Sequence, residues 1–165
     1  SNKKDQLALT KKYAFTENGI LVQYILQNNS DKDIKGFFAV ENNFSIPFTH
    51  KKNIIIEVLV DKKRCCPSYN EKYIEKEHVS LLQITDANAK NSFVLEPNEN
   101  AGLFLEPLFS ARPLIDSEDI PRLEANSAVF FWDITIPAAK EIEKNIYLGI
   151  NTAKKKPVAK KTRKQ

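Results

Sequence analysis

The sequence predicts an all-β fold, an antiparallel β-sandwich of about nine strands. Apolar and polar residues alternate along most of the chain, which is the period of a strand that buries one of its faces. The alternating segments are rich in β-branched and aromatic residues and are separated by turn-prone residues. No helical pattern is long enough to cover a sheet, so a parallel α/β architecture is disfavoured.

The first two predicted strands form a hairpin. In residues 19–28, GILVQYILQN, the side chains of Val22, Tyr24 and Leu26 share one face, and the two glutamines share the other. Residues 6–15 precede this strand, and the polar connection between the two contains a glycine, which is typical of a hairpin turn. Strands that are neighbours in sequence are expected to pair antiparallel. The same alternation predicts the remaining strands at residues 35–46, 53–60, 79–85, 91–97, 101–109, 127–137 and 144–151.

Two short segments are helical candidates. Residues 68–78 begin with a Ser-x-x-Glu capping box, and residues 138–144 have the length of one or two helical turns. The fold is therefore expected to hold at most one or two short helices. Residues 110–127 are predicted to form a long connection with two prolines, and such connections often contact partners.

Length and charge indicate one domain followed by a tail. At 165 residues the chain is long enough for one hydrophobic core and short for two domains. Residues 1–153 are predicted to form the sandwich. Residues 154–165 carry seven Lys or Arg and no acid, and this composition predicts a disordered tail. The other residues carry 18 basic and 21 acidic side chains, a net charge of −3, so the domain itself has no predicted affinity for nucleic acid. The tail is either a solubilising extension or a nucleic-acid tether.

The chain is predicted to be a cytoplasmic piece of a longer protein. Its apolar runs are far shorter than the roughly 20 residues of a membrane span, and no signal-peptide pattern is present. The chain has no methionine, which is expected of an excised or processed segment. Cys65 and Cys66 are adjacent, so they cannot supply the separated ligands of a zinc site, and a disulfide between them would be strained. Free thiols in a reducing compartment are expected.

The sequence contains no complete catalytic signature. Phosphate-binding loops, metalloprotease motifs and nucleophile elbows are all absent. The two histidines, His50 and His78, are interpreted as a loop residue and as part of an acidic helical stretch. The sequence therefore predicts no catalytic residue, no metal site and no cofactor, and the chain alone is not expected to be an enzyme.

Two predicted strands carry residues suited to carbohydrate binding. In FFAVENNFS, Glu41 and Asn43 share a face with Phe37 and offer acceptors and donors for sugar hydroxyls. The alternative is an ordinary solvent-facing strand end. In FFWDITIP, Trp132 is either a core anchor or a platform that stacks on a sugar ring. Glu41, Asn43 and Trp132 are the candidate carbohydrate-binding residues, and no pair of carboxylates is identified for glycoside cleavage.

Three segments carry a resemblance to a known family. LTKKYAFTENGILVQYILQN, then FFAVENNFS, then FFWDITIPA occur in an order that resembles the all-β carboxy-terminal region of glycoside hydrolase family 57, the α-amylase and 4-α-glucanotransferase group. The resemblance spans most of residues 7–150. It implies a β-sandwich of the mutarotase-like supersandwich type that packs on the catalytic barrel of the same parent chain. The family's catalytic glutamate and aspartate belong to that barrel, so no catalytic residue is carried over.

Three functions follow from these observations. The first is a non-catalytic accessory domain of an α-amylase or 4-α-glucanotransferase, which packs on the catalytic barrel and contacts α-glucan through the three candidate residues. The second is a free-standing protein-interaction module whose basic tail tethers nucleic acid. The third, an epimerase-like sandwich enzyme, is disfavoured because no histidine is well placed. No membrane partner is expected.

Overall fold

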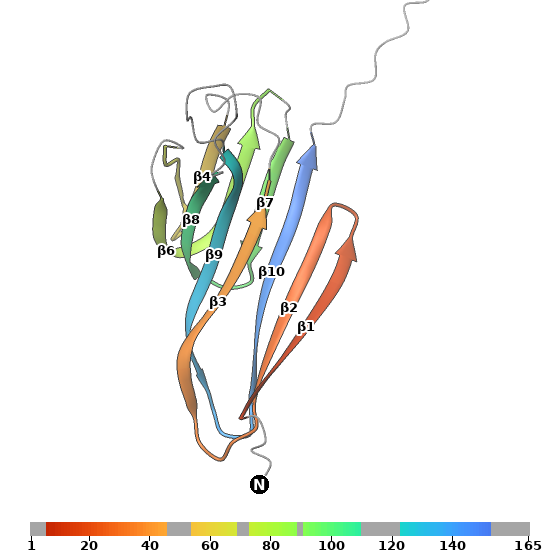
Figure 1. The fold of residues 1–165 in the computed structure, drawn as a ribbon, viewed down its shortest axis with the longest axis vertical. Helices are drawn as coiled ribbons and strands as arrows, with labels where there is room; N and C mark the ends of the chain where they lie inside the picture. The colour runs from red at the N-terminus through yellow and green to blue at the C-terminus, as the bar shows by residue number, and fades with distance from the viewer. Residues whose placement is uncertain (1–5, 46–53, 69–72, 89–90, 110–122, 153–165) are drawn as a thin grey trace, which may run out of the picture.

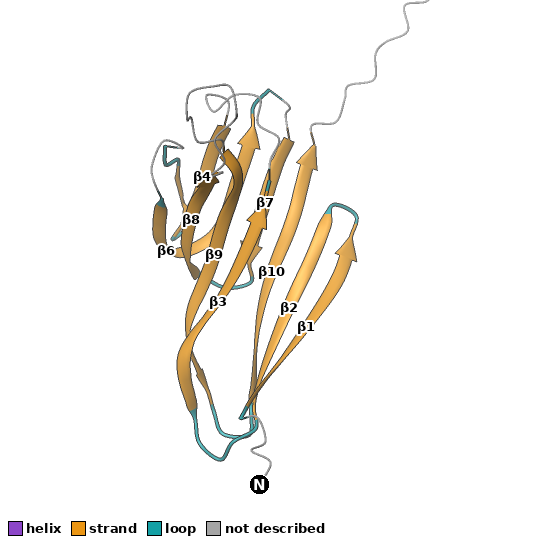
Figure 2. Cartoon of the chain, in the orientation of Figure 1, coloured by secondary structure: helices purple, strands orange, loops and turns teal. Residues whose placement is uncertain are grey.

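The computed structural model describes residues 6–45, 54–68, 73–88, 91–109 and 123–152. Within these ranges every regular element is a strand, and helices are absent (Figure 2). The all-β prediction is confirmed. The ten strands are β1 (Leu7–Thr16), β2 (Gly19–Asn28), β3 (Ile34–Phe44), β4 (Ile54–Val60), β5 (Lys63–Cys65), β6 (Ile74–Asp86), β7 (Asn91–Pro97), β8 (Ala101–Phe109), β9 (Leu123–Ile136) and β10 (Glu141–Thr152).

All ten strands belong to one antiparallel sheet, and β6 is the strand at which that sheet divides. The order along the main path is β1-β2-β10-β7-β6-β8-β9-β3, and β4 with β5 joins the other edge of β6. Residues 82–86 of β6 pair with β7, whereas residues 74–79 pair with β8. Because β7 and β8 occupy successive stretches of one edge of β6, the sheet separates there into two halves.

The two halves face one another and form the sandwich. One half holds β8, β9 and β3, and the other holds β7, β10, β2 and β1 (Figure 1). Aromatic rings meet between the halves. Tyr24 of β2 lies edge-on to Phe38 of β3 at 5.7 Å between ring centroids, and Phe44 of β3 stacks on Phe93 of β7 at 4.4 Å. The curled sheet therefore encloses a core between its own two ends.

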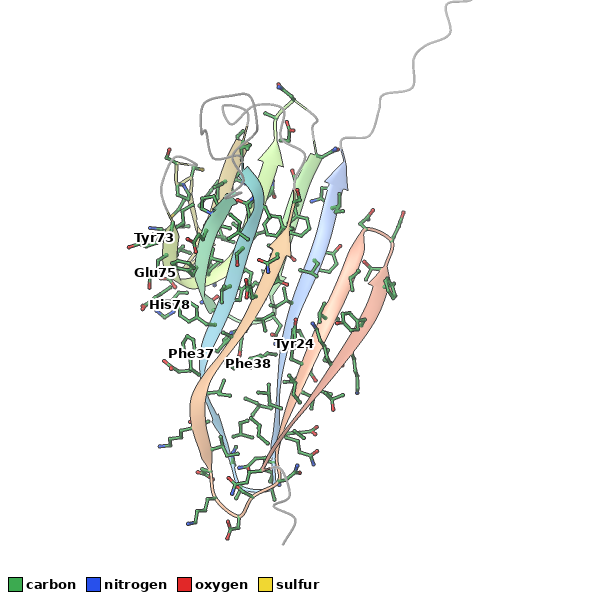
Figure 3. All side chains as sticks on the ribbon, viewed as in Figure 1. Tyr24, Phe37, Phe38, Tyr73, Glu75 and His78 are labelled. Atoms are coloured by element: carbon green, nitrogen blue, oxygen red, sulfur yellow. The ribbon has the colours of Figure 1, made fainter. Side chains whose placement is uncertain are left out.

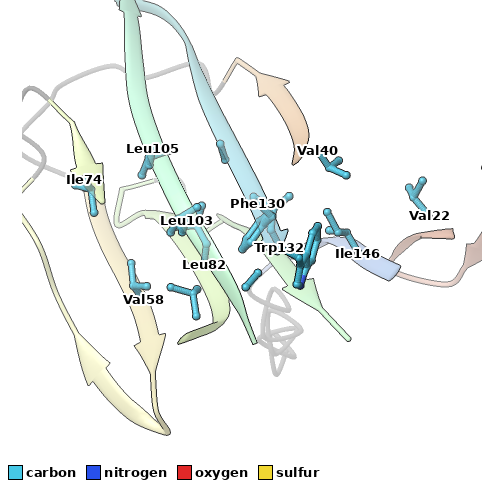
Figure 4. Close-up of a cluster of buried hydrophobic side chains, with 14 of the residues drawn as sticks. Val22, Val40, Val58, Ile74, Leu82, Leu103, Leu105, Phe130, Trp132 and Ile146 are labelled. Carbon is cyan, nitrogen blue, oxygen red and sulfur yellow. The ribbon is translucent and has the colours of Figure 1, made fainter. Parts of the chain in front are cut away.

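The core is built from the alternating positions of the strands. On β9, the side chains of Phe130, Trp132, Ile134 and Ile136 are all buried, as the alternation predicts. Leu82 of β6 joins the same cluster, which Figure 4 shows running across both halves. Burying large aliphatic and aromatic side chains stabilises a fold by about 1.5–3 kcal/mol for each of them. This cluster accounts for much of the stability of the domain.

A buried asparagine fastens one end of the sandwich. The Asn28 Nδ2 donates to the carbonyl oxygens of Lys32 at 2.7 Å and of Ile136 at 3.0 Å. The Asn28 Oδ1 accepts from the backbone N–H and the hydroxyl of Ser30. These bonds tie the end of β2 to the end of β9, and they satisfy every polar atom of a side chain that is almost fully buried.

The two helical candidates are wrong where the structure describes them. Residues 74–78, from the candidate at 68–78, belong to β6, and residues 74–76 pair with residues 103–105 of β8. Residues 141–144, from the candidate at 138–144, belong to β10 and pair with residues 24–27 of β2. Capping boxes are local signals, whereas strand pairing is supplied by residues distant in sequence, and here the distant pairing prevails.

The predicted strand pairing is correct at the hairpins only. The pairs β1–β2, β4–β5, β6–β7 and β8–β9 are sequential, but β3 pairs with β9, and β10 lies between β2 and β7. Connections such as β2 to β3 carry the chain from one half to the other, so their strands cannot form a hairpin. The short strand β5 was not predicted. Residues 123–127, predicted as part of a connection, extend β9 because they pair with β8.

Several predictions fall on other parts of the chain. His50, most of the connection at 110–127 and the basic tail at 154–165 lie outside the described residues, and so does the nucleic-acid tether that depends on the tail.

Cys65 is half-buried, Cys66 is exposed, and both thiols are free. Within the described ranges, no helix is long and apolar enough to cross a membrane.

Candidate functional site

Glu41 and Asn43 lie together on the outer face of β3, as predicted. The Glu41 Oε1 accepts from the Asn43 Nδ2 at 3.0 Å and from the Ser127 hydroxyl of β9 at 3.0 Å. Phe37 projects from the same side of β3, opposite Phe38, and is 62% exposed (Figure 3). Its ring packs on the ring of Phe131 at 5.1 Å between centroids. This outer face therefore combines aromatic and polar groups.

Trp132 lies on the opposite face of the same half, with the core residues. Its side chain is 6% exposed and stacks on Phe38 at 6.0 Å between ring centroids. The indole therefore acts as a core anchor, and neither face of its ring is free to serve as a broad sugar platform. The structure does not bring Trp132 together with Glu41 and Asn43, because adjacent positions of β3 and β9 point to opposite sides of the sheet.

A cavity of about 400 Å³ lies where β8 begins, and we call it the bulge cavity. Pairing of β8 with β9 starts at Gly102 and Phe131, so residues 132–136 of β9 have no β8 neighbour. The bulge cavity lies beside the part of β9 that β8 leaves unpaired. Its volume lies within the range of about 300–1,000 Å³ that is typical of small-molecule sites. It is lined by Glu77, His78, Glu99, Asn100, Ala101, Gly102, Phe131, Trp132, Asp133 and Lys144.

A β-bulge in β6 places Glu77 and His78 at the cavity. The register of β6 against β8 shifts between Lys76 and Val79, and the backbone of His78 has a φ of 56°. A bulge re-aims side chains that a regular strand would direct elsewhere, and a positive φ in a residue other than glycine is uncommon. His78 is exposed at the edge of the molecule, near Glu75 (Figure 3). Its interpretation as part of a helical stretch is therefore wrong.

Lys144 of β10 forms one wall of the bulge cavity. Its ammonium group pairs with the Glu99 carboxylate and lies 5.7 Å from the centroid of the Trp132 ring. Burial lowers the pKa of Lys144 from the ordinary value of 10.5, because desolvation penalises the charged form. This wall thus presents a fixed positive charge already balanced by one carboxylate.

Phe131 and Gly102 form the floor of the bulge cavity, on the outer face of the sheet. A Cβ atom on Gly102 would lie 2.0 Å from the nearest atom of the Phe131 ring, so the ring lies directly over the glycine. Only a residue without a side chain allows this close approach. Because Phe131 also packs on Phe37, the floor of the bulge cavity is continuous with the outer face that carries Glu41.

The chemistry of the bulge cavity suits the binding of hydroxyl groups. Three carboxylates, one imidazole, one amide and one ammonium line it, beside two aromatic rings. Carboxylates accept hydrogen bonds from hydroxyl groups, and the Phe131 ring can cover apolar C–H surface, whereas the Trp132 ring is covered by its neighbours. Among the described residues, no group of three His, Cys, Asp or Glu is arranged to hold a metal ion. Of the three sequence candidates, Trp132 alone lines the cavity.

A second surface of interest is the inner side of β1, which we call the β1 inner row. In the register of β1 against β2, Leu9 lies opposite Leu26 and Tyr13 lies opposite Val22. Opposed residues of an antiparallel pair point to the same face, so these residues of β1 point to the core side of the sheet. They are exposed because no described strand covers them. The row consists of the apolar residues Leu7, Leu9, Tyr13 and Phe15, with exposures from 43% to 81%. Lys11 lies between Leu9 and Tyr13 on the same face, opposite Tyr24.

The sequence model for a family described as alpha-amylase/4-alpha-glucanotransferase, C-terminal, matches residues 1–111. No match was found among curated proteins. Among solved structures, the chain is similar to the 4-alpha-glucanotransferase from Thermococcus litoralis, with a TM-score of 0.61 and 19% identity over 87% of this chain. That alignment covers 18% of the glucanotransferase.

Two other similar structures are described as galactose mutarotase-like proteins. A galactose mutarotase-like protein from Clostridium acetobutylicum has a TM-score of 0.64 and 11% identity over 93% of this chain and 60% of its own. A galactose mutarotase-like protein from Lactobacillus casei has a TM-score of 0.63 and 8% identity over 88% of this chain and 63% of its own. At such identities the likeness establishes a shared fold. The chain spans less than two thirds of each of these proteins.

Proposed function

Because the chain belongs to the family of alpha-amylase/4-alpha-glucanotransferase C-terminal domains, we propose that it packs on the catalytic barrel of its parent protein and contacts α-glucan. Its role is that of a non-catalytic accessory domain. The parent protein in this proposal is a cytoplasmic α-amylase or 4-α-glucanotransferase of glycoside hydrolase family 57. The free thiols of Cys65 and Cys66 are compatible with a reducing compartment.

The observation that carries the docking half of this proposal is the β1 inner row. Phe15 is 81% exposed and Tyr13 is 57% exposed, although both point to the core side of the sheet, on a face of β1 where Lys11 is the one charged residue. β1 is also an edge strand, because β2 is its one partner among the described strands (Figure 1). Exposed apolar residues in a row on an edge strand favour aggregation of a free domain and are typical of a surface that another structure covers.

The occupant that we propose is the catalytic barrel, not a second copy of this chain. The similar glucanotransferase is far longer than this domain, since the matched region is 18% of its length. A chain of that length has ample structure outside the sandwich with which to cover an apolar row. The mutarotase-like proteins also extend well beyond the matched region. Coverage by additional structure in the same polypeptide needs no separate association step.

Binding to the separately expressed catalytic barrel of the parent protein tests this proposal. Isothermal titration calorimetry with the unmodified chain is expected to give a saturable complex of one domain per barrel. Replacing both Leu9 and Phe15 by serine is expected to weaken it at least tenfold, because buried aromatic and aliphatic anchors dominate the affinity of interfaces. The matched control is Lys12→Ser, on the opposite face of β1, which is expected to bind as the unmodified chain does.

Two outcomes would refute the docking proposal. One is a complex whose affinity is unchanged in the Leu9→Ser, Phe15→Ser variant, since the barrel would then occupy another surface. The other is self-association of the chain, measured by analytical ultracentrifugation, that disappears in the same variant. The β1 inner row would in that case be the contact between two copies.

A further inference from the structure

Trp132 contributes a buried polar atom that has no partner. Its Nε1 makes no hydrogen bond with the described residues, although the side chain is 94% buried and lines the bulge cavity. A buried donor without an acceptor is unfavourable, so such a group calls for a partner from outside the described residues, either water or a ligand. The atom itself has almost no accessible surface, so a ligand oxygen in the cavity would supply the missing acceptor once the indole shifts toward it.

Two carboxylates that line the bulge cavity also have no partner among the described residues. Glu77 and Asp133 both line the cavity and form no ion pair or hydrogen bond with other described residues. They come from different strands, β6 and β9, so they approach the cavity from two sides. Carboxylates placed on two sides of a cavity can accept hydrogen bonds from the neighbouring hydroxyl groups of a sugar ring. The His78 imidazole beside Glu77 adds a donor or an acceptor.

The charge of the lining selects among ligands. Lys144 is balanced by Glu99, which leaves Glu77 and Asp133 as an excess of negative charge. This excess opposes a phosphorylated sugar or any other anion. The Phe131 ring on the floor offers an apolar surface for the C–H face of a sugar ring. Together these groups fit a neutral ligand that has many hydroxyl groups and one apolar face.

We propose that the bulge cavity binds the end of an α-glucan chain, holding one or two glucose units. This inference deepens the proposed function, because it assigns the glucan contact to the bulge cavity. Glu77 and Asp133 accept hydrogen bonds from the sugar hydroxyls, the Trp132 Nε1 donates to a sugar oxygen, and the Phe131 ring supports the apolar face. Glu41 and Asn43 do not line the cavity, so their role is at most with units farther along the chain.

The direct test is a titration of the purified chain with maltotriose. Trp132 is the single tryptophan, so its fluorescence reports on the cavity, and calorimetry gives the affinity independently. We expect a saturable fluorescence change. Glu77→Gln and Asp133→Asn are each expected to weaken maltotriose binding about tenfold, since each removes a hydrogen bond to a charged acceptor. Glu75→Gln is the matched control, because Glu75 is an exposed carboxylate of β6 that does not line the cavity.

Three results would overturn the inference. The first is no saturable response to maltotriose by either method up to about 10 mM, a concentration at which binding worth roughly 3 kcal/mol would be visible. The second is equal weakening by Glu75→Gln and Glu77→Gln, with all variants folded by near-ultraviolet circular dichroism. The third is saturation by spermidine with no response to maltotriose, which would make this a site for cations. None of these results bears on docking of the barrel, which is measured without saccharide.

Discussion

β9 and β1 carry the same kind of sequence but have opposite environments. On β9, Phe130 is fully buried and Trp132 nearly so, whereas on β1 Leu9 is 56% exposed and Phe15 is 81% exposed. Both strands direct these residues to the inner side of the curled sheet. β9 faces the other half of the sandwich, while β1 extends beyond the strands that would cover it (Figure 1). Alternation therefore defines the face of a strand, but the presence of a cover depends on the rest of the fold.

Two lysines repeat this contrast. The Lys11 ammonium group on β1 lies 5.3 Å from the Tyr13 ring centroid and 5.1 Å from that of Tyr24, and Lys144 lies 5.7 Å from that of Trp132. Hydrogen bonding to Tyr13 raises the pKa of Lys11, whereas burial lowers the pKa of Lys144. The same cation–π geometry thus accompanies opposite shifts, because desolvation dominates in the covered region.

The largest expected difference between the two regions comes from one substitution made in each. Phe130→Ala removes a fully buried ring and is expected to lower the free energy of unfolding by about 3–5 kcal/mol. Phe15→Ala is expected to change it by less than about 0.5 kcal/mol, because the ring is already in solvent. Urea denaturation of the two variants measures both values. A loss above about 1.5 kcal/mol for Phe15→Ala would contradict our description of β1 as uncovered.

A smaller effect is expected from the hydrogen bonds of Asn28, which join the end of β2 to the end of β9. Asn28→Ala leaves the buried carbonyl group of Ile136 and the part-buried carbonyl group of Lys32 without their donor, and it is expected to cost about 2–3 kcal/mol. Asn43→Ala is the control, since Asn43 is an exposed asparagine whose hydrogen bond to Glu41 is open to solvent. Thermal unfolding of both variants compares them. Equal stability of the two would show that the Asn28 bonds do not hold the halves together.

The close contact on the floor of the bulge cavity gives a third comparison. Gly102→Ala forces the Phe131 ring to move and is expected to cost about 1–2 kcal/mol. Gly36→Ala, where an added Cβ meets nothing within 4 Å, is expected to be neutral or slightly stabilising. Chemical denaturation gives the two free energies of unfolding. If both variants matched the unmodified chain, the Phe131 ring would not be fixed by the glycine.

The smallest effects concern the two lysines. Nuclear magnetic resonance titration is expected to place the pKa of Lys11 above 10.5 and that of Lys144 below it, with Lys11→Met and Lys144→Met variants assigning the signals. The two pKa shifts therefore change the free energy of unfolding in opposite directions as the pH rises. The contribution of Lys144 to the free energy of unfolding rises as pH increases through its folded pKa toward 10.5, and that of Lys11 is lost as pH rises above 10.5. Identical pKa values would remove the contrast between the regions.

Much of the fold follows from short-range patterns in the sequence. The faces of β2 and β9 were predictable because Val22, Tyr24 and the Phe130–Trp132 pair alternate strictly with polar or outward residues. The hairpin at Gly19 was predictable from its turn residues. The family resemblance also identified the sandwich type, which residue patterns alone do not distinguish.

The features that escaped prediction depend on distant partners. Residues 74–78 belong to a segment that was predicted to be helical from a capping box at its start, and they are a strand because β8 pairs with residues 74–76. The bulge at His78 arises from the mismatch between β6 and β8, so no local signal marks it. The separation of Trp132 from Glu41 follows from the pairing of β3 with β9, strands about 90 residues apart in sequence. Only the strict alternation within each strand hinted that these residues point to opposite sides.

Hydrogen–deuterium exchange of residues 7–16 tests the central claim most directly. Amides of an uncovered edge strand exchange by local opening, and a docked partner suppresses that opening. We predict fast exchange along β1 in the chain alone and slow exchange once the catalytic barrel of the parent protein is added, with little change in β9. Exchange along β1 that is the same with and without the barrel would contradict the account.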